Sequence, residues 1–199
     1  MYPLVESIKI ENGKPFYLEW HQRRLESAFH HLYKTGPGFQ IAQVLTVPST
    51  YREGTVKCRF LYNSRSYKTE FQPYAQKKRD TLKIVHADWI DYSYKYTNRN
   101  DISALLNRNR ECDDILIVKN GLVTDSSAAN IVFKQNSRWL TPASPLLPGT
   151  TRARLLAEGE IQEAEITPES LGTFDGFVLI NAMIGFNKSN LQKIQNIIF

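Results

Sequence analysis

The sequence predicts an α+β protein with a small N-terminal α+β domain, residues 1–88, and a larger barrel-like domain of mixed α/β structure, residues 89–199. Many short segments alternate apolar and polar residues and end in tight turns, which is typical of antiparallel strands. Few segments repeat apolar residues with helical spacing, and these stand between groups of strands. With 199 residues, of which 42% are hydrophobic, the chain can bury the core of one large or two small domains.

The N-terminal domain begins with a predicted hairpin around an Asn12–Gly13 turn. One face of the strand before this turn carries Leu4, Glu6, Ile8 and Ile10. An amphipathic helix is expected from about Trp20 to Tyr33, where apolar residues recur with the spacing of one helix face. A short helix at residues 41–46 and strands near residues 56–62, 67–71 and 82–85 complete this domain.

The larger domain is expected to begin with an aromatic and polar connection near residues 86–100, followed by a helix to about Arg110. A second hairpin surrounds Asn120–Gly121. Further strands are predicted near residues 115–118, 122–124, 130–133, 138–140, 161–166 and 177–180. Helices are predicted at residues 150–158 and 190–197, the first of them after a loop at residues 145–149.

The net charge is compatible with two kinds of partner, nucleic acid or a small anionic substrate or cofactor. The chain has 25 Lys and Arg against 20 Asp and Glu, which gives a formal net charge of +5. The basic residues are scattered, apart from the run Lys77–Arg79, and no nucleic-acid-binding motif accompanies them. We therefore expect no nucleic-acid partner and assign the charge to an anionic cofactor or substrate.

The sequence also argues against a membrane protein and a metal site. No apolar run approaches the length of a membrane span, and the first residues lack the pattern of a signal peptide. Cys58 and Cys112 are too few for a disulfide framework, and no cysteine or histidine spacing fits a metal. A cytoplasmic protein with no membrane partner and no metal is the simplest expectation.

Two basic residues lie in apolar surroundings. Arg24 lies beside the apolar stripe of the first helix, where it can point inward or extend along the surface, which is the commoner arrangement. Lys95 stands between Tyr94 and Tyr96. Aromatic walls that exclude water would lower the pKa of this lysine and suit Schiff-base chemistry, whereas an exposed lysine would have no such role.

Two later segments have the chemistry of a ligand site. In Gly121–Ile131 a strand ends at Asp125, and small residues that permit close approach to the backbone follow it. In Leu146–Arg152 a loop opens a helix, whose first N–H groups and threonine hydroxyls suit a phosphate.

Taken in order, these segments resemble the fold-type IV family of pyridoxal 5'-phosphate (PLP)-dependent enzymes. This family includes branched-chain and D-amino acid aminotransferases and 4-amino-4-deoxychorismate lyases. The resemblance covers nearly the whole chain and rests on the motifs Val5–Ile8, His21–Leu25, Lys95–Arg99, Val123–Ile131, Leu147–Arg152 and Asn181–Met183. It implies a two-domain D-amino acid aminotransferase-like fold with PLP as cofactor. Because such enzymes carry an extra stretch before the first hairpin, we expect the small domain to be shortened at its N-terminus.

The resemblance implies roles for individual residues. Lys95 matches the lysine that forms the Schiff base with PLP and moves the substrate's proton. Arg24 matches the arginine that binds the cofactor phosphate. Asp125 matches the acid that pairs with the pyridine nitrogen, where the family normally has a glutamate with one more methylene. The remaining cofactor contacts that the resemblance implies are Thr150, Thr151, Asn181 and Ala182.

Within the family, Lys95–Arg99 and Asp125–Asn130 look more like the lyase branch. This implies the conversion of 4-amino-4-deoxychorismate to 4-aminobenzoate and pyruvate, a folate-pathway reaction, by a homodimer with Ser7 and Arg99 near the anionic substrate. Two alternatives stay open. One is an aminotransferase of D-amino or branched-chain amino acids with the same cofactor, and the other is a non-catalytic PLP-fold binding protein.

Overall fold

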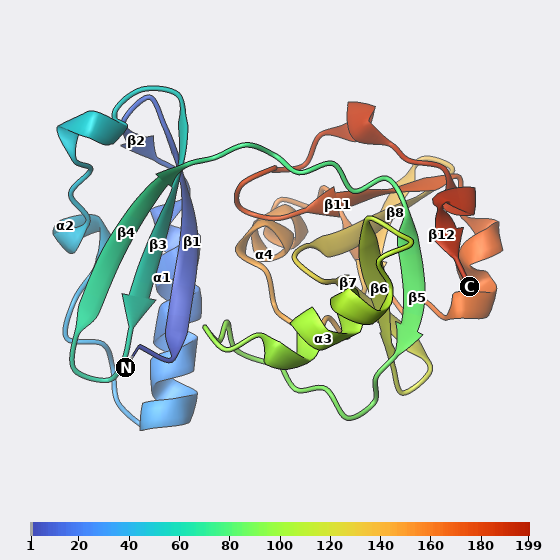
Figure 1. The fold of residues 1–199 in the computed structure, drawn as a ribbon, viewed down its shortest axis with the longest axis horizontal. Helices are drawn as coiled ribbons and strands as arrows, with labels where there is room; N and C mark the ends of the chain where they lie inside the picture. Colours follow the sequence, from blue (N-terminus) through green and yellow to red (C-terminus); the bar gives the residue numbers. More distant parts are fainter. Residues whose placement is uncertain (1) are drawn as a thin grey trace. The chain divides into compact units, whose positions relative to one another are not determined.

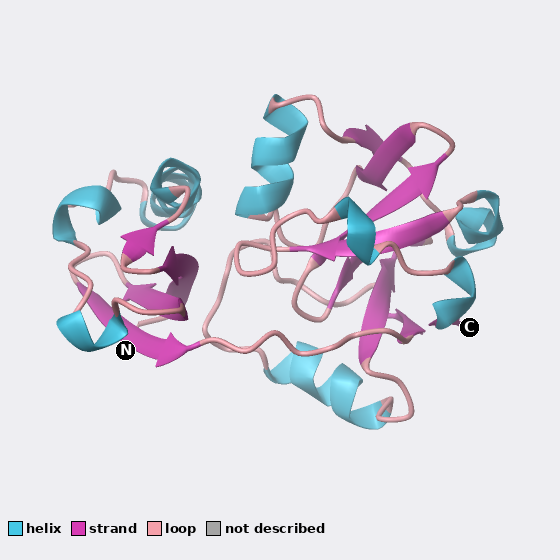
Figure 2. Ribbon diagram, turned by 90° about the horizontal axis from the view of Figure 1, so that it is seen from above, coloured by secondary structure: helices cyan, strands magenta, loops and turns pink. Residues whose placement is uncertain are grey.

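The protein is described by a computed structural model that covers residues 2–199. The chain divides into two units and passes between them three times (Figures 1 and 2). The first unit comprises the residues up to Gln76 together with Tyr94–Asn98, and the second comprises Lys77–Ser93 and Arg99–Phe199. The boundary predicted between residues 88 and 89 falls within the Lys77–Ser93 segment of the second unit.

The first unit contains a four-stranded antiparallel sheet and the helix α1 (Figure 1). The strands lie in the order β2-β1-β3-β4. At the turn between β1 and β2, Asn12 and Gly13 have positive φ values of 48° and 79°, as a tight hairpin requires. The strands of this sheet are β1 (Leu4–Glu11), β2 (Lys14–Pro15), β3 (Thr55–Tyr62) and β4 (Tyr67–Pro73).

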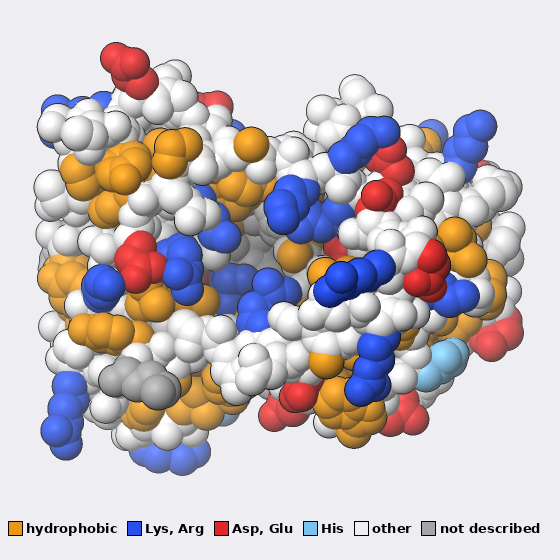
Figure 3. Space-filling model, viewed as in Figure 1, with side chains coloured by type: hydrophobic (Ala, Val, Ile, Leu, Met, Phe, Trp, Pro, Cys, Tyr) orange, Lys and Arg blue, Asp and Glu red, His pale blue; other side chains and the backbone are white. Residues whose placement is uncertain are grey.

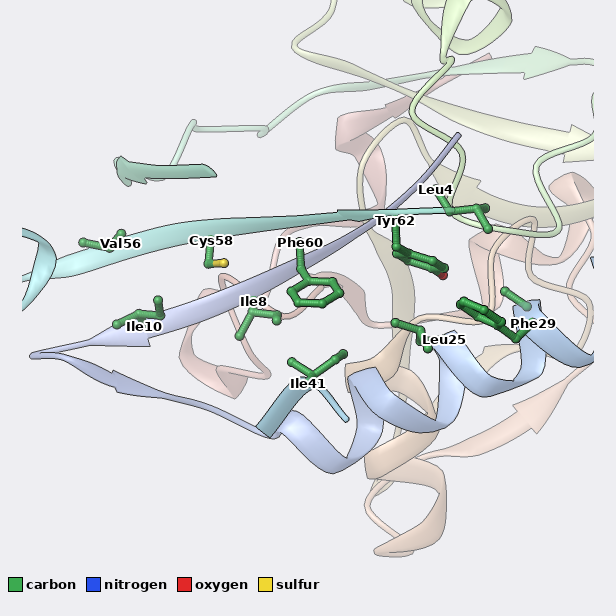
Figure 4. Packing of buried hydrophobic residues seen from close by; sticks show 11 residues of the cluster. Leu4, Ile8, Ile10, Leu25, Phe29, Ile41, Val56, Cys58, Phe60 and Tyr62 are labelled. Carbon is green, nitrogen blue, oxygen red and sulfur yellow. The ribbon is translucent and has the colours of Figure 1, made fainter. Parts of the chain in front are cut away.

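The core of the first unit lies between α1 and the strands β1 and β3 (Figure 4). Leu25 and Phe29 from the helical side meet Ile8 and Phe60 from the sheet. The helix predicted from Trp20 to Tyr33 is observed as α1 (Leu18–Ala28) followed by a π-helical segment, Phe29–Tyr33. The other helical segments of this unit are α2 (Ile41–Val44) and a 3₁₀ turn at Ser49–Tyr51.

The short segment Tyr94–Asn98 packs against the edge of the first unit's sheet. The Val5 N–H donates to the Lys95 carbonyl at 3.0 Å, and the Thr97 N–H donates to the Pro3 carbonyl at 2.8 Å. Tyr94 and Tyr96 pack against the hydrophobic core of this unit. The backbone of Lys95 is therefore fixed beside β1, although 90 residues of chain separate the two.

The second unit contains an eight-stranded mixed sheet (Figure 1). Its strand order is β10-β9-β8-β7-β6-β5-β12, and β11 pairs with β8. Parallel pairing joins β5 to β6 and β12, and β9 to β10, while the other pairs are antiparallel. The strands are β5 (Leu82–His86), β6 (Asp114–Lys119), β7 (Leu122–Ser126), β8 (Asn130–Gln135), β9 (Arg138–Pro142), β10 (Gln162–Ala164), β11 (Gly176–Ile180) and β12 (Ile197–Ile198).

The helices of the second unit are α3 (Asn100–Arg108) and α4 (Thr150–Ala157), with 3₁₀ turns at Pro168–Thr173, Lys188–Asn190 and Ile194–Asn196. The helix predicted near residues 190–197 is wrong. Gln192 exchanges two backbone hydrogen bonds with Phe177, and Ile197 pairs with Leu82 at the edge of the sheet. These non-local bonds hold the terminal segment extended, so that its backbone groups are satisfied by strands rather than by a helix.

No helix among residues 2–199 is both long and apolar enough to cross a membrane. On the face shown in Figure 3, Lys and Arg side chains occupy several separate places and alternate with acidic and apolar side chains. This agrees with the scattered basic residues of the sequence.

Candidate active site

In the first unit, Arg24 is bound to a buried carboxylate. Its Nε donates to Oε1 of Glu6 at 2.9 Å, and its Nη2 donates to Oε2 at 2.5 Å. Glu6 lies on β1 with a solvent-exposed fraction of 0%, on the strand face that also carries the core residues Leu4 and Ile8. His21, one turn before Arg24 on α1, places its Nδ1 2.6 Å from the same Oε2. Arg24 therefore points inward, contrary to the commoner arrangement for a helix arginine.

The charges in this cluster are set by Arg24. Burial by itself would raise the pKa of Glu6, but the charge of Arg24 and the hydrogen bonds from His21 and Arg24 lower it to about 2. Burial lowers the pKa of His21, against the opposite effect of Glu6, and the charges of Arg24 and Lys95 lower it further. Because ionised Glu6 can only accept, the neutral imidazole must carry its proton on Nδ1.

Lys95 belongs to the same unit as Arg24. Its side chain is half-buried, which excludes the fully exposed arrangement. Its backbone carbonyl accepts from the Val5 N–H, one residue before Glu6 on β1. The rings of Tyr94 and Tyr96 contact each other edge to face, with their centroids 6.1 Å apart, and both pack against the core of the first unit. The first unit thus brings Arg24 and Lys95 to one end of β1.

Ser7 is not part of this cluster. It follows Glu6 directly on β1, so its side chain points to the opposite face of the sheet.

In the second unit, Asp125 forms a clamp with residues from two other segments. Its Oδ1 accepts from Nδ2 of Asn130 at 2.7 Å, and its Oδ2 accepts from the Leu147 N–H at 2.8 Å. The same Nδ2 of Asn130 also donates to the Leu147 carbonyl at 2.9 Å. Asp125 is 4% exposed and Asn130 is 5% exposed. We call Asp125, Asn130 and Leu147 the Asp125 clamp.

Burial dominates the ionisation of Asp125. It raises the pKa of this carboxyl to about 6, although the hydrogen bonds from Leu147 and Asn130 and the charge of Arg152 act in the opposite direction. Asp125 is the next-to-last residue of β7, in the middle of the sheet, and the hydrogen bonds that its oxygens accept from the described residues come from neutral donors. A nearby positive charge would therefore be strongly favoured by this carboxylate.

The clamp continues directly into the start of α4. A Cβ atom added to Gly149 would lie 1.9 Å from Oδ1 of Asn130, so this position accommodates only glycine while Asn130 keeps its place. Gly149 caps α4, and Thr150 and Thr151, each 6% exposed, form the first turn. The backbone N–H groups at the start of this eight-residue helix favour an anion.

Asn181 and Arg99 hold the turn that follows Asp125. The Asn181 Nδ2 donates to the Ala128 carbonyl at 3.0 Å, and its Oδ1 accepts from the N–H groups of Met183 and Ile184. Arg99 donates to the Ser127 carbonyl of the same turn. Its guanidinium carbon also lies 6.0 Å from the centroid of the Tyr92 ring. Ala182 follows Asn181 and is half-buried.

Several members of these clusters are not among the site residues predicted from the sequence, namely Glu6, His21, Asn130, Leu147 and Gly149. Glu6 did carry a signal, because it is an acid at an apolar position of a strand. His21 also carried one, since it precedes Arg24 by three residues on a helix. The role of Gly149 depends on a contact with Asn130, 19 residues earlier, which no local pattern encodes.

Comparison with known proteins identifies the family. The model of the class IV amino-transferase family matches residues 3–187. The chain belongs to the class IV aminotransferases. It is 39% identical over 187 residues to an uncharacterised protein of Haemophilus influenzae, an alignment that covers 93% of this chain and all of the relative.

Solved structures of this family have the same fold. A structure from Haemophilus somnus, provisionally described as a 4-amino-4-deoxychorismate lyase, is 40% identical, with a TM-score of 0.86 and coverage of 94% of this chain and 98% of that one. A PLP-bound hypothetical aminotransferase from Mycobacterium tuberculosis has a TM-score of 0.79 at 17% identity, over 98% of this chain and 81% of that one. The predicted fold class is confirmed, and the chain is a PLP-dependent enzyme.

The polar groups of both units fit PLP chemically. The first unit offers an amine at Lys95 for the cofactor aldehyde and a guanidinium at Arg24 for its phosphate. The second unit offers the buried Asp125 carboxylate for the pyridine nitrogen and the start of α4 for the phosphate. The donors and acceptors therefore match an anionic, aldehyde-bearing aromatic cofactor.

Proposed function

We propose that this class IV aminotransferase-fold enzyme is a lyase that converts 4-amino-4-deoxychorismate to 4-aminobenzoate and pyruvate, a step of folate biosynthesis. The observation that carries the proposal is the 40% identity, over 94% of the chain, to the Haemophilus somnus protein provisionally described as this lyase. The motifs Lys95–Arg99 and Asp125–Asn130, which look more like the lyase branch, support it.

In this proposal Lys95 is the catalytic residue. Its Nζ would hold the cofactor through the aldehyde. Once the substrate's amino group has replaced it there, the freed amine would take the proton from the substrate's ring carbon and return it to the departing enolpyruvyl group. When bound, PLP supplies an electron-withdrawing ring that stabilises the negative charge developing on the substrate.

The other proposed residues bind and orient the cofactor. Arg24, Thr150 and Thr151 bind the phosphate, and Asp125 binds the pyridine nitrogen through its negative charge. The clamp fixes the Asp125 carboxylate, so its shorter side chain is held by Asn130 and Leu147 rather than left to rotate. Asn181 and Ala182 complete this proposed set, with Asn181 acting through the turn at Ala128.

We also propose that Ser7 and Arg99 lie near the anionic substrate, and that the enzyme is a cytoplasmic homodimer. Arg99 can serve the substrate and the Ser127 carbonyl together, because a guanidinium has five N–H donors.

An aminotransferase of D-amino or branched-chain amino acids is the second candidate, because Lys95 and Asp125 would serve both reactions. A non-catalytic PLP-fold protein is disfavoured by the family assignment. Incubation with 4-amino-4-deoxychorismate, with 4-aminobenzoate and pyruvate measured, is expected to show multiple turnovers. If amino acids instead convert the bound cofactor to its pyridoxamine form in a single turnover, and no 4-aminobenzoate appears, the aminotransferase replaces the lyase.

The role of Lys95 can be tested by labelling. Borohydride reduction of the PLP-loaded protein is expected to fix the cofactor on the peptide that contains Lys95, as measured by mass spectrometry. Lys95→Ala should fold normally and lose turnover, whereas Lys68→Ala, an exposed lysine on β4 of the same unit, should behave as the wild type. A label on another lysine, or turnover by Lys95→Ala, would remove Lys95 from the mechanism.

A further inference from the structure

The cluster of Glu6, His21 and Arg24 contains more than a phosphate-binding arginine. Glu6 is a carboxylate with no exposed surface, on an otherwise apolar strand face. A buried carboxylate is costly unless it is paired and hydrogen-bonded. Here both oxygens are occupied by basic side chains from α1. Nothing in the roles proposed so far requires an acid at this position.

The geometry of the pair fixes the orientation of Arg24. Glu6 accepts from Nε and from Nη2, so two parallel hydrogen bonds define the plane and the rotation of the guanidinium. A single bond would leave the side chain free to turn. His21 holds Oε2 of Glu6 from a second direction, which prevents the carboxylate from following Arg24 if that side chain moves.

The three side chains of the cluster differ in their exposure to solvent. Glu6 and His21 are 0% and 1% exposed, whereas the Arg24 side chain keeps 14% exposure. Arg24 is therefore the member of the cluster that an anion from solvent can reach. Because arginine side chains lose considerable rotamer freedom when they are ordered, an arginine that is already held pays less of this cost on binding.

We infer that Glu6, supported by His21, is a positioning residue that holds Arg24 in the orientation in which it binds the cofactor phosphate. The inference rests on the proposed role of Arg24. It implies that Glu6 contributes to the preference for PLP over pyridoxal, which has the same aldehyde and ring but no phosphate. An alternative effect has the opposite sign, since the charge of Glu6 partly neutralises Arg24 and its removal would then strengthen phosphate binding.

The test is equilibrium binding of PLP and of pyridoxal to the cofactor-free protein, measured by absorbance. Glu6→Gln keeps the size of the side chain but replaces one of the two oxygens that accept from Arg24 with an NH₂ group, which can only donate. PLP binding is expected to weaken about 10-fold or more, as for a lost charge-assisted hydrogen bond, while pyridoxal binding changes less than about 2-fold. Glu70→Gln is the matched control, because Glu70 forms surface ion pairs on β4 of the same unit, and it should leave both affinities unchanged.

A double-mutant cycle separates positioning from a general loss of structure. In the Arg24→Gln background, Glu6→Gln is expected to have no further effect on PLP affinity, because Glu6 acts through Arg24. Circular dichroism and thermal unfolding show whether each variant is folded. If Glu6→Gln does not fold, Glu6→Asp provides the test, since it keeps the charge but withdraws the carboxylate and should also reduce the ratio of PLP to pyridoxal affinity.

The outcomes distinguish this inference from the proposed function. Equal or tighter PLP binding by folded Glu6→Gln, with normal binding by the wild type, overturns the role of Glu6 and leaves the proposed function intact. Equal losses of PLP and pyridoxal binding also overturn it. If the wild type binds no PLP, both the proposed function and the role of Glu6 are wrong.

Discussion

Glu6 in the first unit and Asp125 in the second are both buried carboxylates, and their pKa values shift in opposite directions. Glu6 in the first unit is in contact with the Arg24 guanidinium, and its pKa falls to about 2. Asp125 in the second unit accepts hydrogen bonds from an amide and a backbone N–H, and its pKa rises to about 6. Both groups are almost completely buried. The comparison shows that the charge of the partner, rather than burial, decides whether a buried acid is stably ionised.

The opposite pKa shifts of Glu6 and Asp125 fit the different roles proposed for these two residues. Glu6 already has its cation and can only support it, so it suits a positioning role. Among residues 2–199, the hydrogen bonds to Asp125 come from neutral donors, and burial raises its pKa. A positively charged pyridine ring would supply the missing partner. The charge of Glu6 is therefore balanced within the protein by Arg24. The charge of Asp125 is unfavourable in the protein alone and stays available for a positively charged ligand.

The largest expected effect is on the free energy of unfolding when Glu6 loses its charge. Glu6→Gln should destabilise the cofactor-free protein by about 3 kcal/mol at neutral pH, because it leaves the buried side of Arg24 without an acceptor of matching charge. A domain of ordinary stability would remain folded after such a loss. Urea unfolding measures the effect, and Glu70→Gln on the surface should cost less than about 1 kcal/mol. Equal losses in the two variants would mean that the buried pair contributes no more than a surface pair.

An intermediate effect is expected from filling the space that Gly149 leaves beside the clamp. Gly149→Ala should cost about 2 kcal/mol of unfolding free energy, because the new Cβ would collide with Oδ1 of Asn130, whose amide is held by Asp125 and Leu147. In Asn130→Ala the obstacle is absent, so adding Gly149→Ala should cost little more. Gly36→Ala, with no atom within 4 Å of the new Cβ, is the control. Additive costs for Asn130→Ala and Gly149→Ala would show that the clamp does not restrict residue 149.

The elements with a local sequence signal are observed as predicted. The Asn12–Gly13 hairpin and the helix that begins near Trp20 follow from turn chemistry and from apolar spacing, and both are observed. The closing helix failed because Ile194 and Ile197 have helical spacing, while the bonds that decide their structure come from Phe177 and Leu82. Local periodicity cannot report backbone pairing with a distant strand.

In the candidate site, too, individual residues could be predicted from the sequence, whereas the contacts between distant residues could not. The family motifs contain Arg24, Lys95 and Asp125, so the resemblance could propose a role for each of them, and these roles stay predictions. The residues that orient them lie in other motifs of the same set: Glu6 in Val5–Ile8 is 18 residues from Arg24, and Leu147 in Leu147–Arg152 is 22 residues from Asp125. A carboxylate partner at such a separation becomes visible only when the sheet register and the loop before α4 are known.

The smallest and most specific effect concerns the pH dependence of stability. The folded-state pKa of Asp125 lies above its ordinary value of 3.8, so its contribution favours folding below about pH 4 and is lost as the pH rises through 6. The pKa of Glu6 is lowered from 4.5, so its contribution is present above about pH 4.5 and is lost as the pH falls toward 2. Asp125→Asn removes only the first of these contributions.

Asp125→Asn should therefore stabilise the cofactor-free protein at pH 8, where ionised Asp125 costs up to about 3 kcal/mol. The net gain should be about 1 to 2 kcal/mol, because the new amide cannot accept from both Asn130 and Leu147. The advantage should shrink as the pH falls from 6 toward 4, which urea unfolding at several pH values can follow. In the loaded enzyme the same change should lower kcat about 100-fold, since a preorganised charge is lost. A variant less stable than the wild type at every pH would mean that Asp125 is satisfied by its neutral donors alone, and the contrast with Glu6 would disappear.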